Sequence, residues 1–443
     1  MPNRRSFLAT LAAPAILDSL EARHAPAAGW GALPGAASEA APAPRAVPDL
    51  PGDSDPAYWD RIRDQFYFPR TEAFFNTGTI GAVPRFVLER VIDDMRLVEA
   101  TVARWDYTAR TDNSISGYSP QLPLREKLGK LVNADASELA LVQNATMGMN
   151  MLASGIELKA GDEIITTDRE HPGGVCGWQM RAKRDGAVWK HMVMPQPAND
   201  PDEVVRLFEE QITPRTRVLA FPHIISPTTV VMPAKKLVSL AHAHNCLAII
   251  DGAHAVGQIE LNLHDLGCDA YFSSPHKWLL APPGNGMLYI RADRQDQFWT
   301  TLCSSEWDDH KSGMYRFMQY GTGNQSLLVG LDAALDFHFR IGPDRVRKRI
   351  RFLADRLRSG LKQIPGATIN SPVNPEMCAA MTVYSVRGVH GSDLEETMWE
   401  RRRLRPRSMG DPLGVRHSCH IYNSEAEVDA ALEIVSDLAK EHA

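Results

Sequence analysis

The sequence has few cysteines, no excess of basic charge and no long apolar segment. Its six cysteines are scattered, with no Cys-x-x-Cys pair, which argues against a disulfide framework or a metal site and favours buried thiols. The formal net charge is −6, so the basic surface typical of nucleic-acid-binding proteins is not expected. Apolar runs stay shorter than a membrane-spanning helix needs, and we expect no membrane span.

What the sequence does contain is the composition of a soluble globular protein. Of its 443 residues, 44% are hydrophobic and 23% are charged. A chain of this length is too long for one ordinary hydrophobic core, so two domains are expected.

The first residues are typical of an export signal. Arg4-Arg5 is followed by Phe7-Leu8 and a weakly apolar stretch that is too short to span a membrane, as in twin-arginine signal peptides. We therefore predict a signal peptide over residues 1–25, an Ala- and Pro-rich linker over 26–55, and a periplasmic location. The alternative is a disordered tail with a chance pair of arginines, which would leave the protein in the cytoplasm.

Residues 246–291 carry the strongest chemical signal in the chain. One short apolar run ends at Asp251, and the next ends just before Lys277; such runs are typical of buried strands. Ligands of open α/β sheets bind beyond the carboxyl ends of the strands, so both residues are expected to face one ligand. A lysine that forms a Schiff base and an acid that pairs with a pyridinium nitrogen suit pyridoxal 5'-phosphate. Taken alone, each is more simply a surface lysine or a turn aspartate.

Two further predicted strands end in polar turns. The strand at 139–142 gives way to a helix at Ala145 and Thr146, where the helix N-terminus and the threonine hydroxyl can form an anion site. An ordinary helix cap is the alternative. His171 follows the strand at 163–167 and is placed to lie on the face of the cofactor ring, although a lone histidine after a strand is more often a loop residue.

The remaining pattern predicts the fold class. A strand at 218–223 is followed by a helix at 232–244, and this alternation of strand and helix predicts a largely parallel sheet covered on both faces. Amphipathic helices are also expected at 85–105 and 426–440, and a basic one at 345–361 is expected to be solvated.

From about Gly366 the predicted elements become shorter, which indicates a smaller second domain. This part of the chain contains Arg416. A guanidinium group is the natural two-pronged partner of a carboxylate, so Arg416 is the candidate anchor for an amino-acid substrate. A surface arginine in a salt bridge is the alternative.

In this order and at this spacing, the motifs resemble the class V aminotransferase family of fold-type I pyridoxal-phosphate enzymes. The similarity runs from about residue 70 to the end; the isopenicillin-N epimerase-like branch is the most similar, and cysteine desulfurases are more distant. The matching motifs are Asn76-Thr77-Gly78, Asn144-Ala145-Thr146, Glu170-His171, Asp251-Gly252-Ala253-His254, Ser274-Pro275-His276-Lys277, Gly321-Thr322 and Arg416 with Tyr422-Asn423.

The resemblance implies an α/β fold of the fold-type I class. A large domain over residues 91–335 would hold a mostly parallel seven-stranded sheet flanked by helices, and a smaller α+β domain would span 336–443. Residues 56–90 would form an N-terminal segment that packs with the small domain. The family also implies a homodimer whose active sites are shared between subunits.

The resemblance also implies roles for individual residues. Lys277 would hold the cofactor as a Schiff base and later shuttle the Cα proton, Asp251 would pair with the pyridine nitrogen, and His171 would stack on the ring. Arg416 would bind the substrate carboxylate. The other implied contacts are His254 near the ring hydroxyl, Ala145, Thr146, Ser274 and His276 at the phosphate, Thr322 at the phosphate of the partner subunit, and Asn76 and Thr79 on the substrate side.

One departure from the family bears on the reaction. Cysteine desulfurases carry a catalytic cysteine on a loop before the arginine that corresponds to Arg416, and residues 401–411 contain none. Cys419 lies beyond that arginine. This argues against a desulfurase, and His254 in place of a glutamine also favours the epimerase-like branch.

The sequence therefore predicts a pyridoxal-phosphate-dependent enzyme that acts at the Cα atom of an amino acid, or of an amino-acid moiety in a larger peptide metabolite. Epimerisation, transamination and loss of a β-substituent all begin with removal of the Cα proton, and the residues do not choose among them. A C–S or β-elimination lyase of the desulfurase type is the alternative enzyme. A non-catalytic binding protein is the alternative from another class, but its expected mark, loss of Lys277 or Asp251, is not found.

Overall fold

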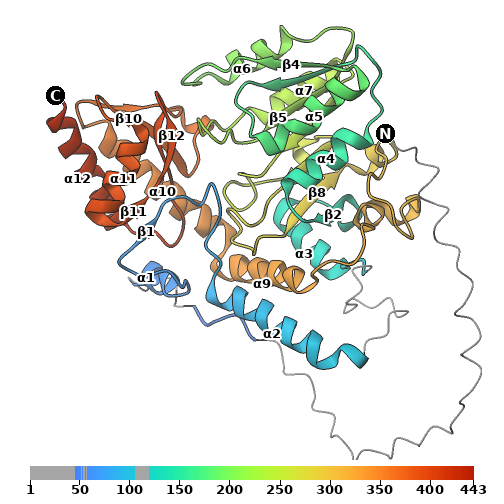
Figure 1. Ribbon diagram of the computed structural model, residues 1–443, viewed down its shortest axis with the longest axis horizontal. Coiled ribbons are helices and arrows are strands. Elements are labelled where there is room, and N and C mark those ends of the chain that lie inside the picture. The colour runs from blue at the N-terminus through green and yellow to red at the C-terminus, as the bar shows by residue number, and fades with distance from the viewer. Residues whose placement is uncertain (1–44, 51, 53–54, 56, 105–118) are drawn as a thin grey trace, which may run out of the picture. The chain divides into compact units, whose positions relative to one another are not determined.

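A computed structural model describes residues 45–50, 52, 55, 57–104 and 119–443 (Figure 1). The predicted signal peptide, residues 1–25, lies outside this described part, as does most of the predicted linker, 26–55. No helix within the described residues is long and apolar enough to cross a membrane.

A seven-stranded sheet forms the centre of the fold, with the strand order β2-β8-β7-β6-β5-β3-β4. β8 runs antiparallel to its neighbours β2 and β7, and the other neighbouring pairs are parallel. The sheet is therefore mostly parallel, as predicted. Its strands are β2 (Leu139–Val142), β3 (Glu163–Thr167), β4 (Val188–Met192), β5 (Thr216–Pro222), β6 (Leu247–Asp251), β7 (Ala270–Ser273) and β8 (Gly286–Ile290).

Helices connect the strands of this sheet and pack against it (Figure 1). α4 (Ala145–Gly155) follows β2, α5 (Pro172–Asp185) follows β3, α6 (Pro201–Glu209) follows β4, and α7 (Ala234–Ala243) follows β5. Because helices cover the sheet, its strands are mostly short apolar runs. Every residue of β3, β7 and β8 is buried, and so is every residue of the edge strand β2. α7 begins directly after Pro233, two residues later than the predicted start at 232.

A second sheet, toward the C-terminus, is antiparallel and has the order β12-β13-β10-β9. Its strands are β9 (Ala367–Ile369), β10 (Met381–Val386), β12 (Arg407–Gly410) and β13 (Gly414–Ser418). The helices that pack against it are α10 (Pro343–Leu361), α11 (Gly391–Arg402) and α12 (Glu425–Glu441). β12 and β13 form a hairpin, which brings their side chains into register.

The N-terminal residues contact both parts of the fold. β1 (Ala73–Phe74) pairs in parallel with β11 (Leu404–Arg405). Phe75 belongs to the apolar cluster beside the second sheet, whereas Phe66 belongs to the main cluster around the first. The turn that follows β1 is held next to the end of β13, where Asn76 forms a bridge with Ser418.

The helices predicted at 85–105 and 345–361 are both present, but each differs from its prediction in one respect. The helix predicted at 85–105 is α2 (Arg85–Thr101), which runs beside α9 (Ser326–Ile341) (Figure 1). The basic helix predicted at 345–361 is α10, but its expected solvation is wrong for Arg349 and Arg358, which are buried. Arg349 pairs with Glu425 of α12 at 2.6 Å, and Arg358 donates to backbone carbonyls beside β10.

The short elements complete the described chain. They are α1 (Tyr58–Arg63), η1 (Val102–Arg104), α3 (Leu122–Val132), η2 (Ala136–Glu138), α8 (Leu263–Leu266), η3 (Ala292–Gln297), η4 (His310–Met318) and η5 (Pro375–Met377).

Candidate active site

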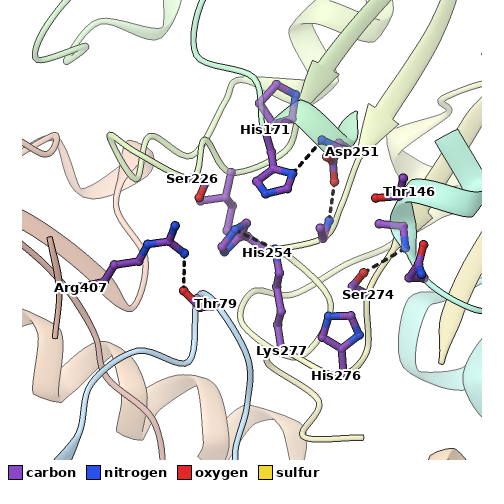
Figure 2. A pocket seen from close by; sticks show the side chains of 17 residues that line it. Thr79, Thr146, His171, Ser226, Asp251, His254, Ser274, His276, Lys277 and Arg407 are labelled. Atoms are coloured by element: carbon purple, nitrogen blue, oxygen red, sulfur yellow. Dashed lines mark hydrogen bonds between the residues drawn. The ribbon is translucent and has the colours of Figure 1, made fainter. Parts of the chain in front are cut away.

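A cavity of about 290 Å³ lies at the carboxyl ends of β5, β6 and β7 (Figure 2). β5 ends at Pro222 and β6 ends at Asp251, and both residues line the cavity. This is the place where open α/β sheets bind their ligands. The other lining residues are Gly78, Thr79, Asn144, Ala145, Thr146, His171, Gly173, Ile224, Ser226, Ala253, His254, Ser274, His276, Lys277 and Arg407.

Asp251 places a buried carboxylate in this cavity. Its Oδ1 atom accepts the backbone N–H of Ala253 at 2.8 Å. Burial raises the pKa of Asp251, while that hydrogen bond and the Lys277 cation lower it. The first turn of α5 passes close to the carboxylate: a Cβ atom on Gly174 would lie 2.6 Å from Oδ2. Glycine is therefore needed at 174 for this approach.

Lys277 follows β7 and extends its amine into the cavity. Its Nζ atom lies 3.0 Å from Nε2 of His254 (Figure 2). Burial lowers the pKa of Lys277 to about 8; Asp251 opposes this shift, and the positive charges of Arg416 and Arg407 add to it. The amine is therefore neutral in a much larger fraction of molecules near neutral pH than an exposed lysine would be.

His254 is held in one tautomer. The indole N–H of Trp278 is only a donor, and it lies 3.5 Å from Nδ1 of His254, which accepts. Burial, and then the nearby cation of Lys277, hold the pKa of His254 well below its usual range, so the ring is neutral. Its single proton is then on Nε2, which faces the amine of Lys277.

The N-terminus of α4 forms an anion cradle. Asn144 caps the helix by accepting the N–H of Met147 at 2.8 Å. The N–H of Ala145 donates to Oγ of Ser274 at 3.0 Å, which fixes that hydroxyl at the helix end. Nδ1 of His276 is buried without a hydrogen bond of ordinary geometry. Burial, and then the Lys277 cation, lower the pKa of His276 to about 4, against an opposing backbone contact with Asn285. Helix N-termini with such donors bind phosphate groups.

The residues present fit pyridoxal phosphate. The Lys277 amine lies in the same cavity as a buried carboxylate, Asp251, and an anion cradle in which Nδ1 of His276 has no hydrogen bond of ordinary geometry. Thr146 adds a hydroxyl at the cradle. Gly173 leaves room for this hydroxyl, since a Cβ atom on residue 173 would lie 2.5 Å from Thr146 Oγ1. A primary amine, an acid for the ring nitrogen and a phosphate site are the groups that this cofactor requires.

His171 caps α5 and borders the cavity. Its Nδ1 atom accepts the N–H of Gly173 at 3.0 Å, so the neutral ring carries its proton on Nε2. Burial, followed by the cations of Lys277, Arg407 and Arg416, lowers the pKa of His171. The ring is therefore kept neutral beside the cofactor site.

Arg416 lies on β13, behind the wall of the cavity. It is fully buried. Its Nη1 atom donates to the backbone oxygen and the hydroxyl of Ser226, both at 3.0 Å, and Nη2 donates to Asn76 at 3.3 Å and Thr79 at 3.5 Å. Nε has no partner, and burial lowers the pKa of Arg416 to about 9. Gly78 lets the guanidinium approach, because a Cβ there would lie 2.7 Å from Nη2.

Arg407 and Ser226 line the cavity but are not among the predicted site residues. Arg407 donates to Thr79 at 2.6 Å (Figure 2), and it lies directly across the hairpin from Arg416. The stretch Asp411-Pro412-Leu413-Gly414 is rich in turn residues. Interpreting it as a hairpin turn would have predicted that Arg407 lies near Arg416. No comparable local signal marks Ser226, which reaches the site only through the fold.

Thr322 is the one predicted cofactor contact that does not line this cavity. It is exposed in the segment between η4 and α9. None of the six cysteines, all of which lie in the described part of the chain, lines the cavity either. Cys419 is buried, and burial raises its pKa to about 12, so it is no source of a thiolate.

Comparison with known sequences identifies a family and two groups of relatives. The aminotransferase class-V model matches residues 74–431. An isopenicillin N epimerase of Streptomyces clavuligerus is 30% identical over 404 residues, covering 87% of this chain and 99% of that protein. One from Amycolatopsis lactamdurans is 31% identical over 406 residues, covering 86% and 99%. A probable cysteine desulfurase of Halalkalibacterium halodurans is 25% identical over 383 residues, covering 81% and 90%.

Solved structures show the same fold. A variant of the lyase C-DES, with glycine covalently linked to its pyridoxal-phosphate cofactor, superposes with a TM-score of 0.75 at 24% identity, covering 85% of this chain and 99% of that one. An apo cysteine desulfurase from Thermococcus onnurineus NA1 gives a TM-score of 0.73 at 23% identity, covering 86% and 98%. The α/β architecture predicted from the sequence is therefore confirmed.

Proposed function

The chain belongs to the aminotransferase class-V family and is a pyridoxal-phosphate-dependent enzyme; from this premise we propose that it acts at the Cα atom of an amino acid, or of the amino-acid moiety of a larger metabolite. One observation carries the proposal. The cavity presents the Lys277 amine together with a buried acid, Asp251, and lies against the buried guanidinium of Arg416.

Lys277 is the proposed attachment point of the cofactor and the base that moves the Cα proton. Because its pKa is lowered to about 8, much of the free amine is neutral near that pH and accepts a proton. When bound, pyridoxal phosphate supplies an electron sink that stabilises the negative charge left at Cα. With the cofactor bound, Asp251 would hold a proton on the pyridine nitrogen, His171 would cover the face of the ring, and His254 would lie near the ring hydroxyl.

The anion cradle is the proposed site of the cofactor phosphate. Ser274 and the N–H groups that begin α4 offer hydrogen bonds, and His276 offers a buried ring nitrogen without a hydrogen bond of ordinary geometry. Thr146 contributes a hydroxyl. A phosphate held there leaves the opposite side of the cavity, at Thr79 and Arg407, open to the substrate.

Arg416 is the proposed anchor of the substrate carboxylate. Its present acceptors are neutral oxygen atoms of Ser226, Asn76 and Thr79, and a carboxylate makes stronger, charge-assisted bonds than these. Asn76 and Thr79 then orient the guanidinium from the substrate side.

Epimerisation or transamination is the proposed outcome of proton removal. The similarity to two isopenicillin N epimerases supports a reaction confined to Cα. A lyase of the cysteine desulfurase type is the alternative, because such proteins are also relatives. The site does not support this lyase alternative, because no cysteine in the described part of the chain lines the cavity.

Incubation of the holoenzyme with L- and D-amino acids in deuterated water tests the proposal. We expect deuterium at Cα, with inverted configuration for an epimerase, or a keto acid with the aminated cofactor for a transaminase. Release of sulfide or persulfide from cysteine would instead indicate the lyase. Lys277→Ala is the control and should show none of these products. If no amino acid, and no peptide with a free α-amino group, exchanged its Cα proton, the proposal would be overturned.

Export and subunit assembly are further proposals. The Arg4-Arg5 pair supports twin-arginine export to the periplasm. The double variant Arg4→Lys, Arg5→Lys should block this export, as measured by cell fractionation.

Thr322 is exposed and does not line the cavity of its own subunit. This supports a homodimer in which Thr322 contacts the cofactor phosphate of the partner subunit. Sedimentation at several concentrations tests the dimer, and a monomeric holoenzyme with full activity would exclude it.

A further inference from the structure

Two guanidinium groups lie together at the substrate end of the cavity. Arg407 of β12 is the direct cross-strand partner of Arg416 of β13, so both side chains leave the same face of the hairpin. Both donate to one acceptor, Oγ1 of Thr79, at 2.6 Å from Nη1 of Arg407 and 3.5 Å from Nη2 of Arg416. Like charges placed directly opposite each other destabilise a sheet, so this arrangement carries a cost that an anion would relieve.

No acidic side chain in the described part of the chain forms an ion pair with either arginine. The acceptors of Arg416 are neutral, and the hydrogen bond of Arg407 goes to Thr79. Arg405, only two residues before Arg407, is different: it pairs with Glu395 at 3.5 Å and lies over the ring of Trp399. Of these three neighbouring arginines, Arg405 therefore has an acidic partner, whereas the two at the cavity have none.

The two arginines differ in how they are held. Arg416 is fully buried and fixed by Ser226, Asn76 and Thr79, as suits an anchor for the carboxylate common to all amino acids. Arg407 is exposed, lines the cavity itself and makes one hydrogen bond within the protein. Its remaining donors face a cavity in which Asp251 is the only acid among the described lining residues.

We infer that Arg407 binds a second acidic group of the substrate, so that the preferred amino acid or amino-acid moiety carries two acidic groups. A carboxylate that pairs with one guanidinium in the two-pronged geometry uses both of its oxygen atoms, which leaves the charge of the second guanidinium without a partner. A side-chain carboxylate of the substrate supplies that partner. The inference rests on the proposed function, in which Arg416 holds the α-carboxylate.

Binding of matched acids and amides to the holoenzyme tests this inference. L-Glutamate and L-glutamine, and L-aspartate and L-asparagine, have nearly the same shape and differ in one charge. Their dissociation constants follow from the change in cofactor absorbance on titration. We expect the wild-type enzyme to bind the acid of at least one pair at least tenfold more tightly than the amide.

The variant Arg407→Gln should lower this acid-to-amide ratio to about one, mainly by weakening binding of the acid. Arg405→Gln is the matched control and should keep the wild-type ratio, because Arg405 already has its own acidic partner. Arg416→Gln should weaken acid and amide by the same factor. Cofactor content and melting temperature confirm that each variant is folded.

Equal affinity for acid and amide in the wild-type enzyme would overturn the inference, as would an acid preference that survives in Arg407→Gln. Either result leaves the proposed function standing, since amino acids would still bind at the cofactor. If no amino acid changed the cofactor spectrum, the proposed function would fail together with the inference.

Discussion

The Nζ atom of Lys277 lies 3.0 Å from Nε2 of His254. His254 is neutral and accepts the Trp278 N–H on Nδ1, so its Nε2–H points at the lysine nitrogen. A hydrogen bond in that direction needs the lone pair of a neutral amine. The contact therefore acts with burial to favour the form of Lys277 that reacts with an aldehyde or accepts a proton.

Covalent attachment of pyridoxal phosphate to the apoenzyme should report this state of Lys277. Only the neutral amine reacts, and its fraction rises as the pH passes upward through the pKa, which burial lowers to about 8. Stopped-flow absorbance should therefore show an attachment rate that increases with pH, is half-maximal near pH 8 and is constant above it. A rate that keeps rising toward pH 10.5, as for an exposed lysine, would contradict the assignment.

Asp251→Asn should separate cofactor binding from catalysis. The amide keeps the size of the side chain and can still accept the Ala253 N–H, but it no longer holds a proton on the pyridine nitrogen. We expect the variant to attach the cofactor through Lys277, while deuterium exchange at Cα falls by on the order of 10²-fold or more. Full exchange activity in this variant would show that the buried carboxylate has another role.

Gly78→Ala should weaken substrate binding without touching the cofactor. The added methyl group would lie 2.7 Å from Nη2 and 2.8 Å from Cζ of Arg416, so the guanidinium must move away. We expect KM for carboxylate substrates to rise about tenfold, which corresponds to about 1.4 kcal/mol, with cofactor content unchanged. Gly52→Ala is the control, because nothing lies within 4 Å of a Cβ there. An unchanged KM in Gly78→Ala would argue against the role of Arg416.

Ser274→Ala should impair recognition of the cofactor phosphate. The substitution removes the hydroxyl that accepts the Ala145 N–H at the start of α4, so that the helix end loses one ordered partner for an anion. We expect affinity for pyridoxal phosphate to fall about tenfold and affinity for pyridoxal, which lacks the phosphate, to stay the same; fluorescence titration of the apoenzyme measures both. A parallel loss for the two ligands would indicate a structural effect.

Glu163, at the start of β3, should contribute to stability above mildly acidic pH. Burial alone would raise its pKa, but hydrogen bonds from Lys190, Thr213, Arg215 and Thr216 outweigh burial and lower it to about 2. Because the folded pKa is below the ordinary 4.5, this stabilisation is complete above pH 4.5 and is lost as the pH falls toward 2.

We expect Glu163→Gln to lower the free energy of unfolding by about 2–4 kcal/mol at pH 7, as measured by urea denaturation, with the site residues unaffected. The difference between wild type and variant should shrink as the pH is lowered through 4.5. A difference that stays constant with pH would mean that the carboxylate charge is not responsible.

Much of the site could be predicted because its signals are local. A short apolar run that stops at Asp251, and another that stops before Lys277, reveal strand ends, and parallel strands bring such ends to one edge of a sheet. The helix that begins at Ala145 is likewise visible in a few consecutive residues. The structure brings these residues together in one cavity at the edge of the seven-stranded sheet.

On the substrate side, Asn76 and Thr79 were predicted only through the family resemblance, because no local signal marks their contacts. Arg416 contacts Ser226, 190 residues earlier, and Asn76, 340 residues earlier. Such contacts depend on how the hairpin of β12 and β13 is placed against the turn after β1, which no short stretch of sequence encodes. The expectation that the helix at 345–361 is solvated failed for the same reason, because Glu425 of α12 reaches Arg349 only in the folded chain.

By itself, the sequence determined the cofactor chemistry of this protein, since Asp251, Lys277 and the start of α4 are each marked by the end of a strand or the beginning of a helix. The tertiary structure is what places two arginines at the end of the cavity where we propose that the substrate binds. The register of one hairpin sets Arg407 opposite Arg416, and a register shift of one residue would turn either side chain to the other face. Strand pairing is a non-local property, and it is what turns two separate arginines into one site.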